Sequence, residues 1–126
     1  MTENEISKIV VEAAIEAHRT LGGPGLLESV YEEALVSELK QRGMEVERQK
    51  AVPIVYKGAR LANSLRPDLV VAGKVIVGCK ATREENPVFS AQALTYLRLM
   101  NRRLALVINS DKRLVKDGIH RVVNRL

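Results

Sequence analysis

Two charged residues, at the ends of neighbouring apolar segments, have side chains suited to phosphate chemistry. Asp68 begins the apolar segment 68–72, and Lys80 ends the apolar segment 74–80. If these segments are strands that pair through a tight turn at Gly73, Asp68 and Lys80 lie near each other. The pair could be an ordinary ion pair, or a metal ligand and a lysine that orients water or phosphate.

A third candidate is an acid at the start of a predicted helix. Glu28 follows a Gly-Pro-Gly loop, and the helix dipole favours an acid there, so it is either a simple cap or a member of the site. Because side chains alternate along a strand, Gly78 and Lys80 should share one face, and Val77 and Cys79 the other. We expect Cys79 to pack as a small apolar residue.

Apolar spacing predicts the elements that position these residues. Helices are expected over about 4–20, with Asn4 as N-cap, and over about 27–42, ending at Gly43. The predicted apolar face of the second helix consists of Leu27, Val30, Tyr31, Ala34, Leu35 and Leu39.

The pattern then changes to that of strands, with one further helix. The predicted elements are one or two strands in 45–56, a turn at 57–58, strands at 68–72 and 74–80, a helix at 89–101, a strand at 104–109 and a weaker strand at 118–124. In the helix we expect Ala91, Leu94, Leu97 and Met100 to face inward. This order predicts an α/β (α+β) fold, with a mixed central sheet flanked by helices in one domain over 1–126.

Composition narrows the class of protein. The chain has 126 residues, 46% hydrophobic and 28% charged, which is typical of a globular domain. No apolar run approaches the roughly 18 residues of a membrane span, and the N-terminal pattern is not that of a secretion signal. A cytoplasmic protein without membrane association is expected. The single cysteine excludes an internal disulfide and a multi-cysteine zinc site.

Charge is distributed unevenly along the chain. Residues 1–47 contain ten acidic and four basic side chains, a net charge of −6, whereas residues 48–126 contain five acidic and sixteen basic ones, a net charge of +11. A basic second half indicates a polyanion such as nucleic acid as partner. The alternative is a well-solvated surface that only aids solubility.

Seven residues at the start of the second predicted helix form a motif. Gly25-Leu26-Leu27-Glu28-Ser29-Val30-Tyr31 fits the pattern GxxExxY. Further characteristic segments lie at 53–58, at Arg66 with Asp68-Leu69, and at 91–99, 106–109 and 116–124. Together and in this order they resemble the GxxExxY proteins, small members of the PD-(D/E)xK nuclease superfamily, over nearly the whole chain.

The resemblance implies a restriction-endonuclease-like fold and metal-dependent hydrolysis of phosphodiesters in nucleic acid. It implies that Asp68 and Glu28 bind Mg²⁺ or Mn²⁺, and the backbone carbonyl of Cys79 could add a ligand. Lys80 would orient the attacking water or neutralise developing charge. Gln92 stands where related nucleases often carry a glutamine that faces the site.

One position departs from the family pattern. Where the family typically reads Glu-Leu-Lys, this chain reads Gly78-Cys79-Lys80. Glycine offers no side-chain ligand, so metal binding and hydrolysis should be impaired, since loss of even supporting groups costs 10–100-fold. Two acids in the following loop, Glu84 and Glu85, are nearby in sequence.

Two other functions remain open. The chain could be a non-catalytic module that binds nucleic acid through phosphate contacts. It could also be an interaction subunit, in particular a homodimer, because a single sheet often leaves an apolar face to cover. The candidate nucleic-acid-binding residues are Arg66, Arg98, Arg102, Arg103, Lys112 and Arg113.

Overall fold

A computed structural model describes residues 1–126 as helices on both sides of a five-stranded sheet, with a separate hairpin. In chain order the elements are α1 (Glu3–Leu21), α2 (Glu28–Gln41), β1 (Val46–Arg48), β2 (Val52–Tyr56), β3 (Ala59–Leu65), β4 (Leu69–Val71), β5 (Val75–Lys80), α3 (Val88–Met100), β6 (Leu104–Asn109), a 3-10 turn (Val115–Gly118) and β7 (Ile119–Val123). None of the helices is long and apolar enough to cross a membrane.

The central sheet is mixed, as predicted. Its strand order is β1-β4-β5-β6-β7. β5 and β6 are parallel, and every other neighbouring pair is antiparallel. A parallel pair requires a crossover connection, and α3 provides it between β5 and β6.

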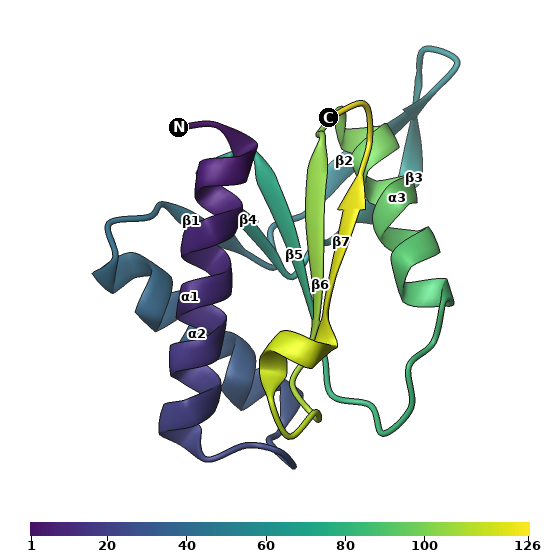
Figure 1. Cartoon of the computed structure of the whole chain (residues 1–126). Helices are drawn as coiled ribbons and strands as arrows, with labels where there is room; N and C mark the ends of the chain where they lie inside the picture. The colour runs from purple at the N-terminus through teal and green to yellow at the C-terminus, as the bar shows by residue number, and fades with distance from the viewer.

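The helices form layers on the two faces of the sheet (Figure 1). The larger core lies under α1 and α2, where Ile6, Val10 and Tyr31 pack against the strands. A smaller core under α3 contains Ile76 and Leu97. The buried apolar residues of α1 recur at three- and four-residue spacing, so this helix buries one face against the sheet.

The helix ends agree with the predictions except at the first N-cap. Thr2, rather than Asn4, caps α1, because Thr2 forms a reciprocal capping box with Glu5. The Thr2 Oγ1 accepts from the Glu5 backbone N–H at 3.2 Å. The Asn4 side chain instead accepts from Arg121. Gly43 follows α2 with φ of +80°, so its predicted role at the helix end is confirmed.

Two predicted helix faces are partly wrong. On α2, Leu27 and Val30 are 70% and 43% exposed, because the row that faces the core runs through Tyr31, Leu35 and Leu39. On α3, Ala91 is exposed. The smaller core is completed by the half-buried Ala93, Tyr96, Met100 and Val122.

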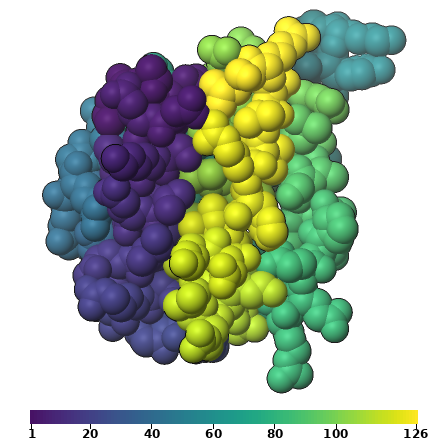
Figure 2. All heavy atoms as spheres, in the orientation of Figure 1, coloured from purple at the N-terminus to yellow at the C-terminus, as the bar shows by residue number.

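A strand that the sequence did not predict, β3, pairs with β2 in a two-stranded hairpin. The turn is at Lys57-Gly58, as expected, and both residues have positive φ. Figures 1 and 2 show this hairpin projecting from the body of the protein. All side chains of β3 except Leu65 are exposed, so the strand lacks the alternation of apolar and polar residues that would have revealed it.

Candidate active site

Asp68 and Lys80 are brought to one region by the β4–β5 hairpin. The turn at Ala72-Gly73 has positive φ at both residues, as the tightest hairpin turns require. The antiparallel register pairs Leu69 with Val77. Asp68 therefore lies just before β4, and Lys80 is the last residue of β5, so the predicted proximity is confirmed.

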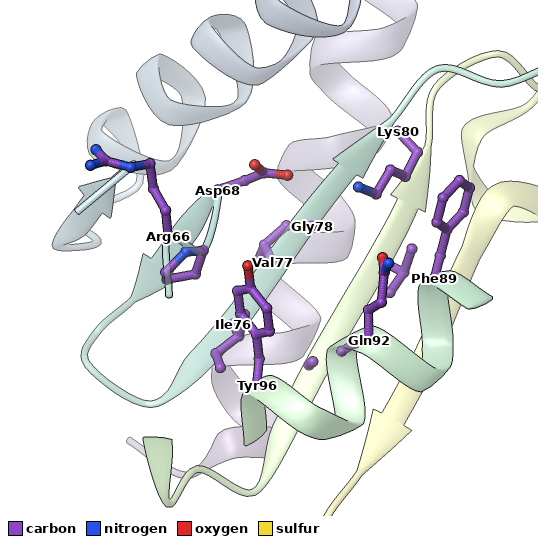
Figure 3. Close-up of a pocket in the computed structure, with 13 residues that line it drawn as sticks. Arg66, Asp68, Ile76, Val77, Gly78, Lys80, Phe89, Gln92 and Tyr96 are labelled. Atoms are coloured by element: carbon purple, nitrogen blue, oxygen red, sulfur yellow. The ribbon is translucent and has the colours of Figure 1, made fainter. Parts of the chain in front are cut away.

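These two residues line a cavity of about 260 Å³ between the sheet and α3. Figure 3 shows Lys80 and Gly78 on β5, with Gln92, Phe89 and Tyr96 projecting from α3 toward them. Gln92 is thus at the cavity, as predicted. Tyr96 is half-buried against the smaller core and also lines the cavity.

Gly78 lines the cavity between Asp68 and Lys80. Its neighbours Val77 and Cys79 belong to the core under α1 and α2, so the alternation predicted for β5 is confirmed. A Cβ atom built at Gly78 meets no heavy atom within 4 Å. The cavity therefore has room for a side chain where the glycine provides none.

Asp68 is held by two hydrogen bonds. The Cys79 backbone N–H donates to its Oδ2 at 2.8 Å, and the Gln49 side-chain amide donates to its Oδ1 at 3.0 Å. The Gln49 backbone N–H also donates to the Asp68 carbonyl at 2.9 Å. The carboxylate is thereby fixed at the edge of the cavity.

Glu32, one turn after Glu28 on α2, is a buried acid that the sequence analysis did not single out. Its Oε1 accepts from the amide of Gln49 at 3.0 Å, and its Oε2 accepts from Arg48 at 3.1 Å. The same Gln49 amide nitrogen therefore joins Glu32 to Asp68. Because Glu32 is only 6% exposed, these partners offset the cost of burying its charge.

Glu28, the first residue of α2, lies near the same groups. Partial burial raises the pKa of Glu28, and the negative charges of Asp68 and Glu32 add to this. The positive charge of Lys80 and the backbone N–H of Ala81 act in the opposite direction on that pKa. The predicted set of Glu28, Asp68 and Lys80 is therefore electrostatically coupled.

The end of β5 is fixed by two buried polar residues, Asn109 at the end of β6 and Ser110 just after it. The Ser110 backbone N–H donates to the Lys80 carbonyl at 2.8 Å. Asn109, paired with Lys80 in the parallel register, exchanges hydrogen bonds with the backbone of Thr82. The ammonium group of Lys80 lies 4.9 Å from the centroid of the Phe89 ring, a distance at which a cation and an aromatic face attract each other.

The donor set fits a divalent cation only in part. Carboxylate oxygens suit Mg²⁺ and Mn²⁺, and Glu32, Asp68 and Cys79 have potential ligand atoms within 4.8 Å of one another. Both oxygens of Glu32 already accept hydrogen bonds from Arg48 and Gln49. Both oxygens of Asp68 accept hydrogen bonds as well, but Asp68 lines the cavity, whereas Glu28 and Glu32 do not. Asp68 is then the one carboxylate at the cavity, and position 78 adds none.

The Cys79 side chain lies away from the cavity, in the core under α1 and α2, as expected. Burial raises the pKa of its thiol well above the ordinary value, and the charge of Asp68 adds to that effect. A neutral thiol is a weak nucleophile and a weak metal ligand.

The loop acids do not replace the missing ligand at position 78. Glu85 forms an ion pair with Lys112 at 3.5 Å and a hydrogen bond with His120 at 2.9 Å. Neither Glu84 nor Glu85 lines the cavity of Asp68 and Lys80.

The six predicted nucleic-acid-binding residues do not line one hollow. Arg66 is at the cavity, where its guanidinium donates to the Gln49 carbonyl at 2.8 Å. Arg98, Arg102 and Arg103 line a separate hollow. The other two, Lys112 and Arg113, lie elsewhere: Lys112 pairs with Glu85, and Arg113 lines a hollow beside the end of α1.

Comparison with known protein families identifies the superfamily of the chain. Residues 4–122 match the family described as PD-(D/E)XK nuclease superfamily. Searches of curated proteins and of solved structures found no match. The mixed sheet flanked by helices is consistent with the restriction-endonuclease-like fold of that superfamily, whose nucleases generally use divalent metals. The chain therefore belongs to the PD-(D/E)XK nuclease superfamily.

Proposed function

We propose that this chain is a GxxExxY-type member of its superfamily that binds nucleic acid and hydrolyses phosphodiesters only weakly. The observation that supports this most is the position of Gly78. It lines the same cavity as Asp68 and Lys80, with open space where a side chain would begin. The cavity thus has the framework of a nuclease site without one carboxylate.

In this proposal each remaining group has a separate task. Asp68 and Glu28 hold a divalent cation, Mg²⁺ or Mn²⁺, and the backbone carbonyl of Cys79 is a further donor. When bound, the cation supplies a more acidic water and offsets negative charge on the phosphate. Lys80 places a positive charge beside the phosphate oxygens, and Gln92 offers a hydrogen bond to the phosphate or the water.

The weakness of hydrolysis follows from the number of ligands. Removing groups that only support a metal ligand costs about 10–100-fold in affinity or activity. Loss of a direct ligand at position 78 should cost at least as much. The remaining carboxylates, those of Asp68 and Glu28, are therefore expected to bind Mg²⁺ weakly.

A second candidate is a nucleic-acid-binding module without hydrolysis. The net charge of +11 over residues 48–126 favours it, since phosphate contacts need positive charge but no complete metal site. Steep salt dependence of binding without cleavage is its expected signature. We also propose the homodimer predicted from the sequence, and light scattering tests it. The predicted cytoplasmic location agrees with either function.

A cleavage and binding panel tests the proposal. Single- and double-stranded DNA and RNA are incubated with Mg²⁺ or Mn²⁺ and the unaltered chain, beside Asp68→Ala as the control for contaminating nucleases. We expect binding to at least one nucleic acid, and slow cleavage that Asp68→Ala removes. Binding with no cleavage on any substrate favours the second candidate, and absence of both binding and cleavage contradicts both.

A further inference from the structure

Four arginines gather in a hollow at the far end of the sheet from Lys80. The hollow has a volume of about 680 Å³, and no acidic or apolar residue lines it. Its lining consists of Arg98, Asn101, Arg102, Arg103, Asn124 and Arg125. None of these arginines takes part in a salt bridge. Their like charges are therefore not compensated by any acid of the chain.

Part of the hollow is fixed by hydrogen bonds to the backbone. Arg103 donates twice to the Arg125 carbonyl, from Nε at 3.2 Å and from Nη2 at 2.8 Å. Arg102 donates from Nη1 to the Met100 carbonyl at 2.9 Å, and Asn124 donates to the Arg102 carbonyl at 3.1 Å. These bonds hold two guanidinium groups in place before any ligand arrives.

Other donors of the hollow have no partner in the protein. The Nε of Arg102 is a buried donor without a hydrogen bond, which is uncommon because such a group costs free energy. Arg98 is in the last turn of α3, where the helix dipole alone favours one cation. The helix dipole therefore explains the presence of Arg98, but not that of the three other arginines. It also does not explain why the Nε of Arg102 has no hydrogen-bond partner.

The chemistry that matches these donors is that of phosphate. A guanidinium group presents a planar set of N–H donors that fits two phosphate oxygens at once. Two arginines that are positioned by hydrogen bonds, two whose side chains make no hydrogen bond in the protein, and two amide side chains can surround more than one phosphate group. The ligand is therefore a polyphosphate or a phosphodiester backbone.

The position of the hollow relative to Lys80 favours the backbone of a nucleic acid as its ligand. In the parallel register, Leu104 pairs with Val75 and Asn109 with Lys80. Arg103 precedes Leu104, so the hollow and Lys80 are separated by about six strand residues, or about 20 Å. That span equals about six base-pair rises along the axis of a duplex. Figure 1 shows the chain's C-terminus near the end of α3.

We infer that the arginine hollow is a second phosphate-binding site, which holds the backbone of a nucleic acid about 20 Å from the phosphate at Lys80. The inference rests on the proposed function, because it requires that nucleic acid binds at the cavity. It adds a minimum length of substrate: a nucleic acid too short to span the two sites gains nothing from the hollow.

The test removes the two arginines whose side chains make no hydrogen bond in the protein. Arg98→Ala with Arg125→Ala is compared with Lys8→Ala with Lys40→Ala, which removes the same charge from exposed positions on α1 and α2. Fluorescence anisotropy measures binding of a 16-base-pair DNA duplex and of a four-nucleotide single strand over a range of NaCl concentrations. Calorimetry measures binding of inorganic tripolyphosphate.

For the duplex, we expect the hollow variant to lose about tenfold or more in affinity at 100 mM NaCl. Its salt slope should fall by about two, one for each lost phosphate contact. The lysine control should keep the slope. The four-nucleotide strand occupies one site at a time, so its affinity should fall less than that of the duplex. Tripolyphosphate binding should be lost in the hollow variant only.

The contrary outcomes separate this inference from the proposed function. If the duplex binds the hollow variant as tightly as the unaltered chain, the hollow is no backbone site, and the proposed function stands without it. If no nucleic acid binds but tripolyphosphate does through Arg98 and Arg125, the proposed function fails, and the hollow is a site for free polyphosphate. If neither ligand binds, both proposals are overturned.

Discussion

Asp68 and Gly78 face each other across the antiparallel pair of β4 and β5. Leu69 lies opposite Val77, and Asp68, the residue before Leu69, accepts a hydrogen bond from the backbone of Cys79 and lines one cavity with Gly78. Directly opposed residues on one face of a sheet have Cβ atoms about 4.5–5.5 Å apart. A side chain at position 78 would therefore begin beside the carboxylate that the fold has already fixed.

Gly78→Glu should tighten metal binding. The substitution adds a carboxylate beside Asp68, and no atom obstructs its Cβ. We expect the affinity for Mn²⁺ to rise about 10–100-fold, as measured by isothermal titration calorimetry. Gly78→Gln has the same shape without the charge, and an equal gain in that variant would contradict a carboxylate site.

Gln49 should contribute to stability through the two acids that it joins. Its amide donates to both Glu32 and Asp68, so Gln49→Ala leaves two neighbouring carboxylates without their shared donor. We expect the free energy of unfolding to fall by about 1–3 kcal/mol, as measured by urea denaturation at pH 7. Gln41→Ala is the control, because Gln41 is exposed and bonds only to Ser37. It should cost about 0.5 kcal/mol or less, and similar losses in both variants would refute the role of Gln49.

Glu28 should lower the stability of the metal-free protein at neutral pH. Burial raises the pKa of Glu28 above its ordinary value of 4.5, so its charged form is less favourable in the folded state than in the unfolded chain. This cost is present above the raised pKa, decreases as the pH falls through it, and is absent below 4.5.

The variant Glu28→Gln should therefore melt at a higher temperature than the unaltered chain at pH 7.5 in the presence of EDTA. The difference should disappear near pH 4. Glu33→Gln, an exposed position on the same helix, serves as the control. A lower melting temperature for Glu28→Gln at pH 7.5 would show that its charge stabilises the fold instead.

The only cysteine should be unreactive in the folded protein. Cys79 is 1% exposed, and burial raises the pKa of its thiol well above the ordinary value. We expect Ellman's reagent at pH 8 to modify it rapidly in guanidinium chloride, and in the native protein only as fast as the chain opens. Rapid modification of the native protein would place the thiol in an accessible site and revive a nucleophilic role.

Local sequence signals sufficed for the parts of the site that neighbouring elements bring together. A tight turn at Gly73 implied that Asp68 and Lys80 meet, and the period of β5 put Gly78 on the same face as Lys80. Both inferences concern residues within one hairpin, where register follows from the turn.

The contacts that span longer separations could not be predicted in this way. Gln49 reaches Glu32 and Asp68, which are 17 and 19 residues away in the sequence. Glu32 interrupts the apolar residues of α2 and has the pattern of a solvent-facing acid, but Arg48 and Gln49 allow its burial. The arginine hollow likewise combines the end of α3 with the C-terminal segment, which no local pattern joins.

The measurement that tests the central claim most directly is the rate at which four forms of the protein cleave the nucleic acid that binds best, with Mn²⁺ present. These are the unaltered chain, Gly78→Glu, Gly78→Gln, and Gly78→Glu combined with Asp68→Asn. If the cavity is a nuclease site without one carboxylate, Gly78→Glu should cut at least about tenfold faster than the unaltered chain. Gly78→Gln and the double variant should show no such gain. No gain with Gly78→Glu in a folded, nucleic-acid-binding protein, or a gain that survives Asp68→Asn, would contradict the account.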